Sequence, residues 1–137
     1  MLINLLPDFL AVLDADDRES AYQRYRDSHR LILDAYWQNY VLDPGSPQAG
    51  DFVAAALRAD RNDLRLLAST VDLVQLAEEA IAKAEEVLQI DRPTDTYLMV
   101  GLGGANAGEL VVGGRGVAFV CLEHFTGRAN PETYGMG

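Results

Sequence analysis

Three residues whose side chains can bind metals or move protons lie close together near the end of the sequence, at Cys121, Glu123 and His124. A thiolate, a carboxylate and an imidazole are common zinc ligands, and a zinc site needs three or four of them. In a strand, however, Cys121 and Glu123 share one face and His124 points to the other, so the three do not converge on one ion. The pattern favours a buried Cys121 and hydrogen-bonded Glu123 and His124 near a strand end.

A glycine-rich stretch, Gly101-Leu-Gly-Gly-Ala-Asn-Ala-Gly108, follows a strand-like segment and could be taken for a phosphate-binding loop. Such a loop leads into a helix whose N-terminus faces the phosphate. The next residues, Glu109-Leu-Val-Val112, are instead typical of a strand, and the only lysine in the chain, Lys83, lies elsewhere. The stretch therefore favours a turn between strands, and a small-molecule domain built on it is the weakest of three functional hypotheses.

Other polar residues have structural explanations. His29 lies on a stripe of tyrosines, which indicates a packed and hydrogen-bonded histidine rather than a catalyst. A cluster of acids suggests a calcium loop, but the glycine and the final acid of that loop are missing, so helix capping explains the cluster better. The acids are Asp14, Asp16, Asp17 and Glu19. No serine lies in a Gly-x-Ser-x-Gly nucleophile motif.

The elements that must position these residues are helical in the first two thirds of the chain. A short strand-like start precedes a helix that opens near Pro7, where proline is accepted. The spacing of tyrosines predicts a helix over 18–40, ended by Asp43-Pro-Gly-Ser-Pro47. A short alanine-rich helix is expected over 51–57, and one long helix over about 62–90, with an apolar stripe that also fits a coiled coil or a bundle.

The last third of the chain is typical of strands. Strands are expected at 96–100, 109–112 and 116–122, and Gly113-Gly-Arg-Gly116 predicts a hairpin between the last two. The helical part, about 1–92, and the strand part, about 94–127, make one domain over 1–137. The order predicts an α+β fold with a small antiparallel sheet.

Bulk properties restrict the classes of partner. The chain has 137 residues, 21 acidic against 11 basic, and a net charge of −10. An acidic surface disfavours nucleic acid and anionic membranes. One cysteine cannot form an internal disulfide, and no apolar run approaches the length of a membrane span. We expect a protein of the cytoplasm.

Three segments carry a resemblance to a known family. They are Ile3-Asn-Leu-Leu-Pro-Asp-Phe-Leu10; Tyr40-Val-Leu-Asp-Pro-Gly-Ser-Pro47 with Asp51-Phe52; and Val100-Gly-Leu-Gly-Gly104 with Phe119-Val-Cys-Leu-Glu-His-Phe-Thr-Gly127 and Asn130-Pro-Glu-Thr-Tyr134. These segments resemble the N-terminal part of a family of uncharacterised bacterial proteins described as predicted zinc-dependent proteases, and the likeness spans most of the chain.

The resemblance implies a thermolysin-like hydrolase in which a sheet precedes a helix carrying His-Glu-x-x-His. The two histidines would hold zinc, and the glutamate would act as general base toward the metal-bound water. No His-Glu-x-x-His occurs in this sequence, and the resemblance places it beyond Gly137. The chain would then be the N-terminal part of a larger metallopeptidase-like domain. It would hold no catalytic residue, metal ligand or cofactor of its own.

What the chain would supply is the wall of the substrate cleft. The resemblance implies that strand 117–122 is an edge strand that pairs with the substrate backbone. The expected substrate-binding residues are Gly103, Gly104, Asn106, Ala118, Phe119, Val120, Glu123 and His124. Without a covering helix, Val112, Val117, Phe119 and Cys121 would be exposed. The expected partners are the C-terminal remainder of the protein, or a second copy, and a peptide substrate.

A second hypothesis belongs to another class of protein. The chain would be a complete, non-enzymatic acidic α+β module that binds a protein partner or dimerises. The lack of a full catalytic set and the regular stripe of the long helix support it.

Overall fold

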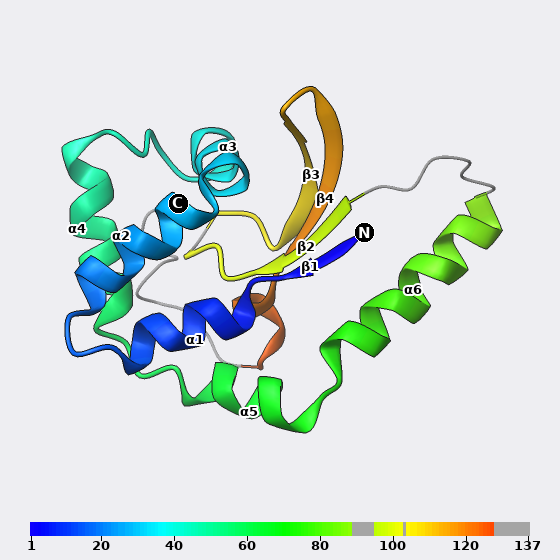
Figure 1. The fold of residues 1–137 in the computed structure, drawn as a ribbon, viewed down its shortest axis with the longest axis horizontal. Helices are drawn as coiled ribbons and strands as arrows, with labels where there is room; N and C mark the ends of the chain where they lie inside the picture. The colour runs from blue at the N-terminus through cyan, green and yellow to red at the C-terminus, as the bar shows by residue number, and fades with distance from the viewer. Residues whose placement is uncertain (89–94, 103, 128–137) are drawn as a thin grey trace.

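A computed structural model describes residues 1–88, 95–102 and 104–127. The helices are α1 (Leu6–Asp14), α2 (Arg18–Ser28), α3 (Arg30–Tyr40), α4 (Pro47–Leu57), α5 (Asn62–Thr70), α6 (Leu73–Leu88) and the short 3-10 helix η1 (Leu122–Phe125). The strands are β1 (Leu2–Asn4), β2 (Asp95–Met99), β3 (Ala107–Val112) and β4 (Arg115–Cys121). The fold is α+β, as the sequence predicts, with α1 to α4 gathered to one side in Figure 1 and α6 to the other.

The sheet has the order β1-β2-β4-β3. β3 and β4 form the predicted antiparallel hairpin through Gly113 and Gly114, which have φ angles of 58° and 78°. β1 pairs with β2 and β2 with β4 in parallel, so the prediction of an antiparallel sheet is wrong. The long helical region between β1 and β2 makes these parallel pairings possible, because parallel strands need a long crossover.

The start of the chain joins the sheet to the helices. Leu5 donates its N–H to the carbonyl of Leu98 at 2.8 Å, and the Asn4 side chain accepts from the Leu6 N–H at 3.1 Å. α1 therefore begins where β1 ends, with Pro7 in its first turn as predicted. Because β1 pairs with β2, the helical and strand parts of the chain form one unit.

The helix predicted over 18–40 is two helices that meet at His29, whose φ and ψ of −124° and 34° are not helical. The break lets the two halves of the tyrosine stripe face different neighbours. Tyr25 of α2 packs edge-on against Phe9 of α1, with ring centres 6.0 Å apart, while Tyr36 of α3 packs against Phe119 of β4 at 5.2 Å. His29 is packed and hydrogen-bonded as predicted: its Nε2 lies 3.0 Å from Asp8 Oδ2.

The acids after α1 act as predicted at a helix start. The Asp17 carboxylate accepts from the Ser20 N–H at 3.1 Å and so caps α2. The next helix predicted, over 51–57, begins earlier, because Pro47 occupies its first turn and the chain turns at Ser46.

The long helix predicted over 62–90 is also two helices, α5 and α6, and residues 89 and 90 lie outside the described part. The hydroxyls of Ser69 and Thr70 both bond back to the Leu66 carbonyl, and Val71 is extended. Hydroxyl and β-branched side chains of this kind weaken a helix. Asp72 then restarts it by accepting from the Gln75 N–H at 3.0 Å.

The face of β4 that was expected to lack cover is buried. Phe119 lies against the rings of both Tyr36 and Tyr40 of α3, and Val117 and Cys121 are also in the core. Val112 is half-buried. The expectation of exposure at Val117, Phe119 and Cys121 is wrong, because α3 rather than a later helix covers this face.

Two glycines give a matched test of this packing. A Cβ at Gly50, inside α4, meets no atom within 4 Å, whereas one at Gly101 would lie 2.6 Å from the Tyr36 hydroxyl and 2.7 Å from Cys121 Sγ. We expect Gly50→Ala to raise the free energy of unfolding by about 0.5–1 kcal/mol, since alanine stabilises helix interiors. Gly101→Ala should lower it by about 1–3 kcal/mol through overpacking. Urea unfolding of both variants checks this, and equal effects would contradict the packing at Gly101.

Candidate functional site

The carboxyl ends of β2 and β4 lie at the same end of the sheet, because the two strands are parallel. The loop from Val100 to Asn106 leaves β2 there, and η1 leaves β4 beside it. Ligands of open α/β sheets bind outside strand carboxyl ends. Four of the residues expected to bind substrate, Gly104, Asn106, Glu123 and His124, lie in or next to these connections, and Gly103 lies outside the described residues.

A buried carboxylate joins the two strand exits. Glu123 is only 2% exposed, and its Oε1 accepts a hydrogen bond from the Gly101 N–H at 3.1 Å. The sequence predicts a strand as far as Leu122, but the chain turns into η1 at that residue, and this turn directs Glu123 inward. The prediction that Glu123 forms a hydrogen bond near a strand end is confirmed.

The cysteine next to this carboxylate is part of the core, as predicted. Cys121 is fully buried and contacts the hydroxyl of Tyr36, which also donates to the Ala105 carbonyl at 3.2 Å. Burial raises the pKa of the Cys121 thiol, and the nearby charge of Glu123 raises it further. The thiol therefore stays protonated at neutral pH, whereas a nucleophilic or metal-binding cysteine must be a thiolate.

His124, the third residue of the group formed with Cys121 and Glu123, lies near Arg61 at the start of α5. His124 is half-buried, and desolvation lowers its pKa, with the charge of Arg61 lowering it further. Arg61 pairs with Asp63 of α5 at 2.8 Å, and Asp63 accepts from the Thr126 hydroxyl at 2.7 Å. These contacts attach the end of η1 to α5. Within residues 1–88, 95–102 and 104–127, no three His, Cys, Asp or Glu side chains are placed to hold a metal ion.

The strand expected to pair with a substrate lies inside the sheet. β4 is hydrogen-bonded to β2 on one side and to β3 on the other, so the backbone at Ala118, Phe119 and Val120 is already used. The prediction that residues 117–122 form an edge strand is wrong. The family resemblance and the place of this strand in chain order suggested it, and neither indicated that β1 would pair with β2 and make β2 and β4 central.

The edges of the described sheet are β1 and β3. A two-residue turn makes Val112 and Arg115 a hydrogen-bonded pair, and such pairs alternate along an antiparallel ladder. The backbone groups of Leu110 therefore face β4, and those of Ala107, Glu109 and Val111 face outward. The Tyr40 hydroxyl donates to the outward Glu109 carbonyl at 3.1 Å. A groove of about 620 Å³ borders this strand, and Asn39 of α3 also lines it.

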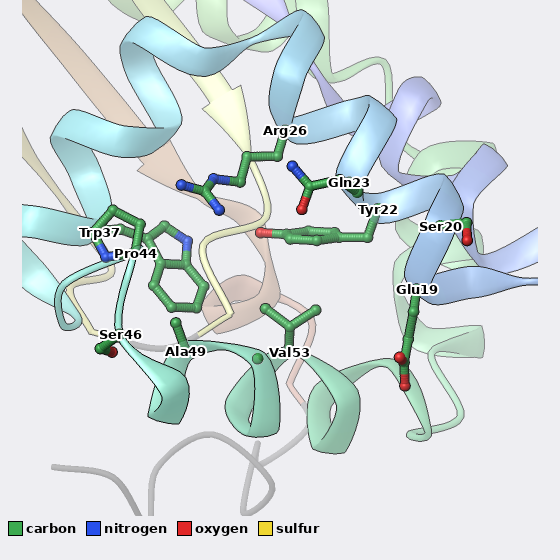
Figure 2. Close-up of a pocket in the computed structure, with 11 residues that line it drawn as sticks. Glu19, Ser20, Tyr22, Gln23, Arg26, Trp37, Pro44, Ser46, Ala49 and Val53 are labelled. Carbon is green, nitrogen blue, oxygen red and sulfur yellow. The ribbon is translucent and has the colours of Figure 1, made fainter.

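A second hollow, of about 470 Å³, lies between α2, α3 and α4 (Figure 2). Arg26, Tyr22 and Trp37 line it, and sequence reasoning assigned none of them to a site. Tyr22 belongs to the tyrosine stripe, which predicted only the packed face of a helix. The spacing contains no signal for the hollow, because it depends on how α4 packs against the other two helices.

Comparisons with protein-family models, with curated proteins and with solved structures find no match for this chain. None of the helices in the described residues is both long and apolar enough to cross a membrane.

The buried hydroxyls and thiol predict sensitivity to alkali. Burial raises the folded-state pKa of Cys121, Tyr22, Tyr25 and Tyr36 above their values in the unfolded chain. Between those two pKa values the unfolded chain has lost a proton that the folded chain keeps, so raising the pH favours unfolding. Stability should be complete below about pH 8.5 and then fall by up to about 1.4 kcal/mol per pH unit for each group.

Urea unfolding across the alkaline range measures this slope. In Cys121→Ala the decline should begin only near the tyrosine range, at about pH 10. An unchanged onset in that variant would show that the thiol titrates normally in the folded protein.

Proposed function

We propose that this chain binds an extended peptide along β3, as the non-catalytic substrate wall of a zinc-dependent peptidase. The observation that supports the peptide-binding part is the position of β3 at an edge of the sheet. Peptides commonly bind by adding a strand to such an edge, where main-chain hydrogen bonds give affinity.

The geometry of β3 suits this role. The strand is six residues long and its Ala107, Glu109 and Val111 side chains are all exposed. Natural edge strands that avoid pairing are short or carry proline or charged side chains, above all lysine. β3 has no proline or lysine, its one charged side chain is Glu109, and Val111 is 72% exposed.

The chemistry of the strand also favours one class of peptide. Glu109 lies in the middle of β3, and the chain has a net charge of −10. Opposite charges on neighbouring strands stabilise a pair by about 0.2–1 kcal/mol, and long-range attraction speeds association. A peptide with a basic side chain opposite Glu109 and β-branched neighbours fits best.

The peptidase part of the proposal rests on the resemblance of the three sequence segments. Zinc would belong to the complete protein, and the bound strand would be its substrate. The coding sequence after codon 137 tests this part directly: a His-Glu-x-x-His motif there supports it. A stop codon would leave β3 as the binding edge of a non-enzymatic interaction module.

Titration with a blocked peptide of alternating valine and lysine, followed by amide NMR, tests the binding edge. We expect the largest shifts at the Ala107, Glu109 and Val111 amides, which face outward, and smaller ones at Val117 and Phe119. Val111→Pro removes one outward donor and should weaken binding about threefold to tenfold, the value of one hydrogen bond.

Val111→Thr is the matched control, because it keeps the N–H and should bind nearly as the parent does. Unchanged chemical shifts of the β3 amides at the highest peptide concentration would contradict the proposal. Concentration-dependent shifts without peptide would mean that β3 pairs with a second copy of the chain instead.

A further inference from the structure

The hollow between α2, α3 and α4 has the form of a small-molecule site. Its volume of about 470 Å³ lies in the usual range for ligand pockets, about 300–1,000 Å³. Walls come from three helices that the core holds in place, since Trp37 packs edge-on against Phe52 at 5.6 Å. The hollow is therefore formed before any ligand arrives.

One end of the hollow is polar. Figure 2 shows the Arg26 guanidinium and the Tyr22 hydroxyl both extending toward the side of Trp37, and Gln23, whose amide donates to Asp27 at 3.1 Å, also lines this end. Tyr22 is buried, and the Trp37 indole lies beside its hydroxyl. Burial raises the pKa of Tyr22 above its usual value, so the hydroxyl stays neutral and can donate.

The positive charge at this end is held in a fixed orientation. Arg26 donates from Nε to Asp34 Oδ1 at 3.0 Å, and both side chains are about three quarters buried, with exposures of 22% and 26%. An arginine has five N–H donors in a fixed fork. The Nε bond to Asp34 leaves the terminal amino groups extended over the hollow (Figure 2). Paired N–H donors of this kind match a carboxylate.

The other end is apolar. The Trp37 ring, Ala49 and Val53 form this wall, and α4 supplies the last two. Glu19 lies at the margin of the hollow, two helical turns from Arg26 on the same helix. The Glu19 carboxylate repels a ligand with two negative charges more strongly than a ligand with one.

We propose that this hollow binds a small monocarboxylate with an aromatic or branched apolar body. Its carboxylate pairs with Arg26, and its body lies between Trp37, Ala49 and Val53. The site is separate from β3, so it stands or fails independently of the proposed peptide binding.

The intrinsic fluorescence of Trp37, the only tryptophan in the chain, gives a direct readout. We expect 3-phenylpropionate to change this emission with a saturable curve. The neutral 3-phenylpropionamide should bind at least about tenfold more weakly, the equivalent of one charge-assisted hydrogen bond. Equal binding of the two compounds, or no saturable change with either, would overturn the proposal.

Substitutions at Arg26 and Gly50 test separately the contribution of the charge and that of the cavity to binding. Arg26→Gln should remove the preference for the carboxylate, while Arg30→Gln, which removes a surface arginine paired with Asp27, should keep it. Gly50→Leu should weaken both compounds, because Gly50 lines the hollow and an added side chain has open space to enter. A fluorescence response unaffected by both Arg26→Gln and Gly50→Leu would place binding elsewhere and overturn the assignment.

Discussion

The packing of α3 against the sheet depends on the absence of a side chain at Gly101. The Tyr36 hydroxyl and Cys121 Sγ both approach the position that a Cβ would occupy there, at 2.6 and 2.7 Å. The N–H of the same glycine donates to the buried carboxylate of Glu123. One residue thus brings together α3, the end of β2, the end of β4 and η1. A buried carboxylate needs such a donor, because an unmatched charge in the core costs several kcal/mol, on the order of the whole stability of a domain.

Helix α3 connects the two proposed binding surfaces. Tyr36 and Tyr40 face the sheet, and the hydroxyl of Tyr40 reaches the outer edge of β3 at the Glu109 carbonyl. Trp37 faces a different direction, toward α4 and the hollow. Neighbouring residues of a helix differ by about 100° in direction, since one turn takes 3.6 residues. The same helix therefore fixes an aromatic wall on each side, and any shift of α3 would change both surfaces together.

The sequence predicted the composition of the fold better than its arrangement. Local patterns located β1, the hairpin at Gly113-Gly114 and the cap at Asp17, because these depend on neighbouring residues alone. The breaks at His29 and Val71 contain neither glycine nor proline, so they were missed. The break at Val71 follows from weak helix formers and the new cap at Asp72, local signals that the apolar stripe obscured. At His29 the two halves of the stripe pack against different elements, and such packing overrides helix propensity.

In the candidate site, too, the sequence predicted local features but not how the strands are arranged. Burial of Cys121 and the hydrogen bond of Glu123 followed from residue type and position in a strand, whereas the edge of the sheet did not. Whether a strand lies at the edge or in the centre of a sheet depends on which strands pair across a long crossover. The alternation of side chains along the strand is the same in both positions, so it does not distinguish them. The parallel pairing of β1 with β2 moved β4 inward and left β3 outside.

The two proposed ligands differ in how the charge of the protein affects them. A net charge of −10 attracts a basic peptide from a distance, and Glu109 continues this attraction at the strand itself. The same field opposes a carboxylate, which must be held by short-range contacts with Arg26. Salt screens the long-range term over about 10 Å at 0.1 M and leaves hydrogen-bonded contacts in partly buried sites much less affected. Added salt should therefore weaken peptide binding at β3 and leave carboxylate binding in the hollow unchanged or stronger. This difference in salt response distinguishes a surface that depends on long-range charge from a pocket that depends on one oriented arginine.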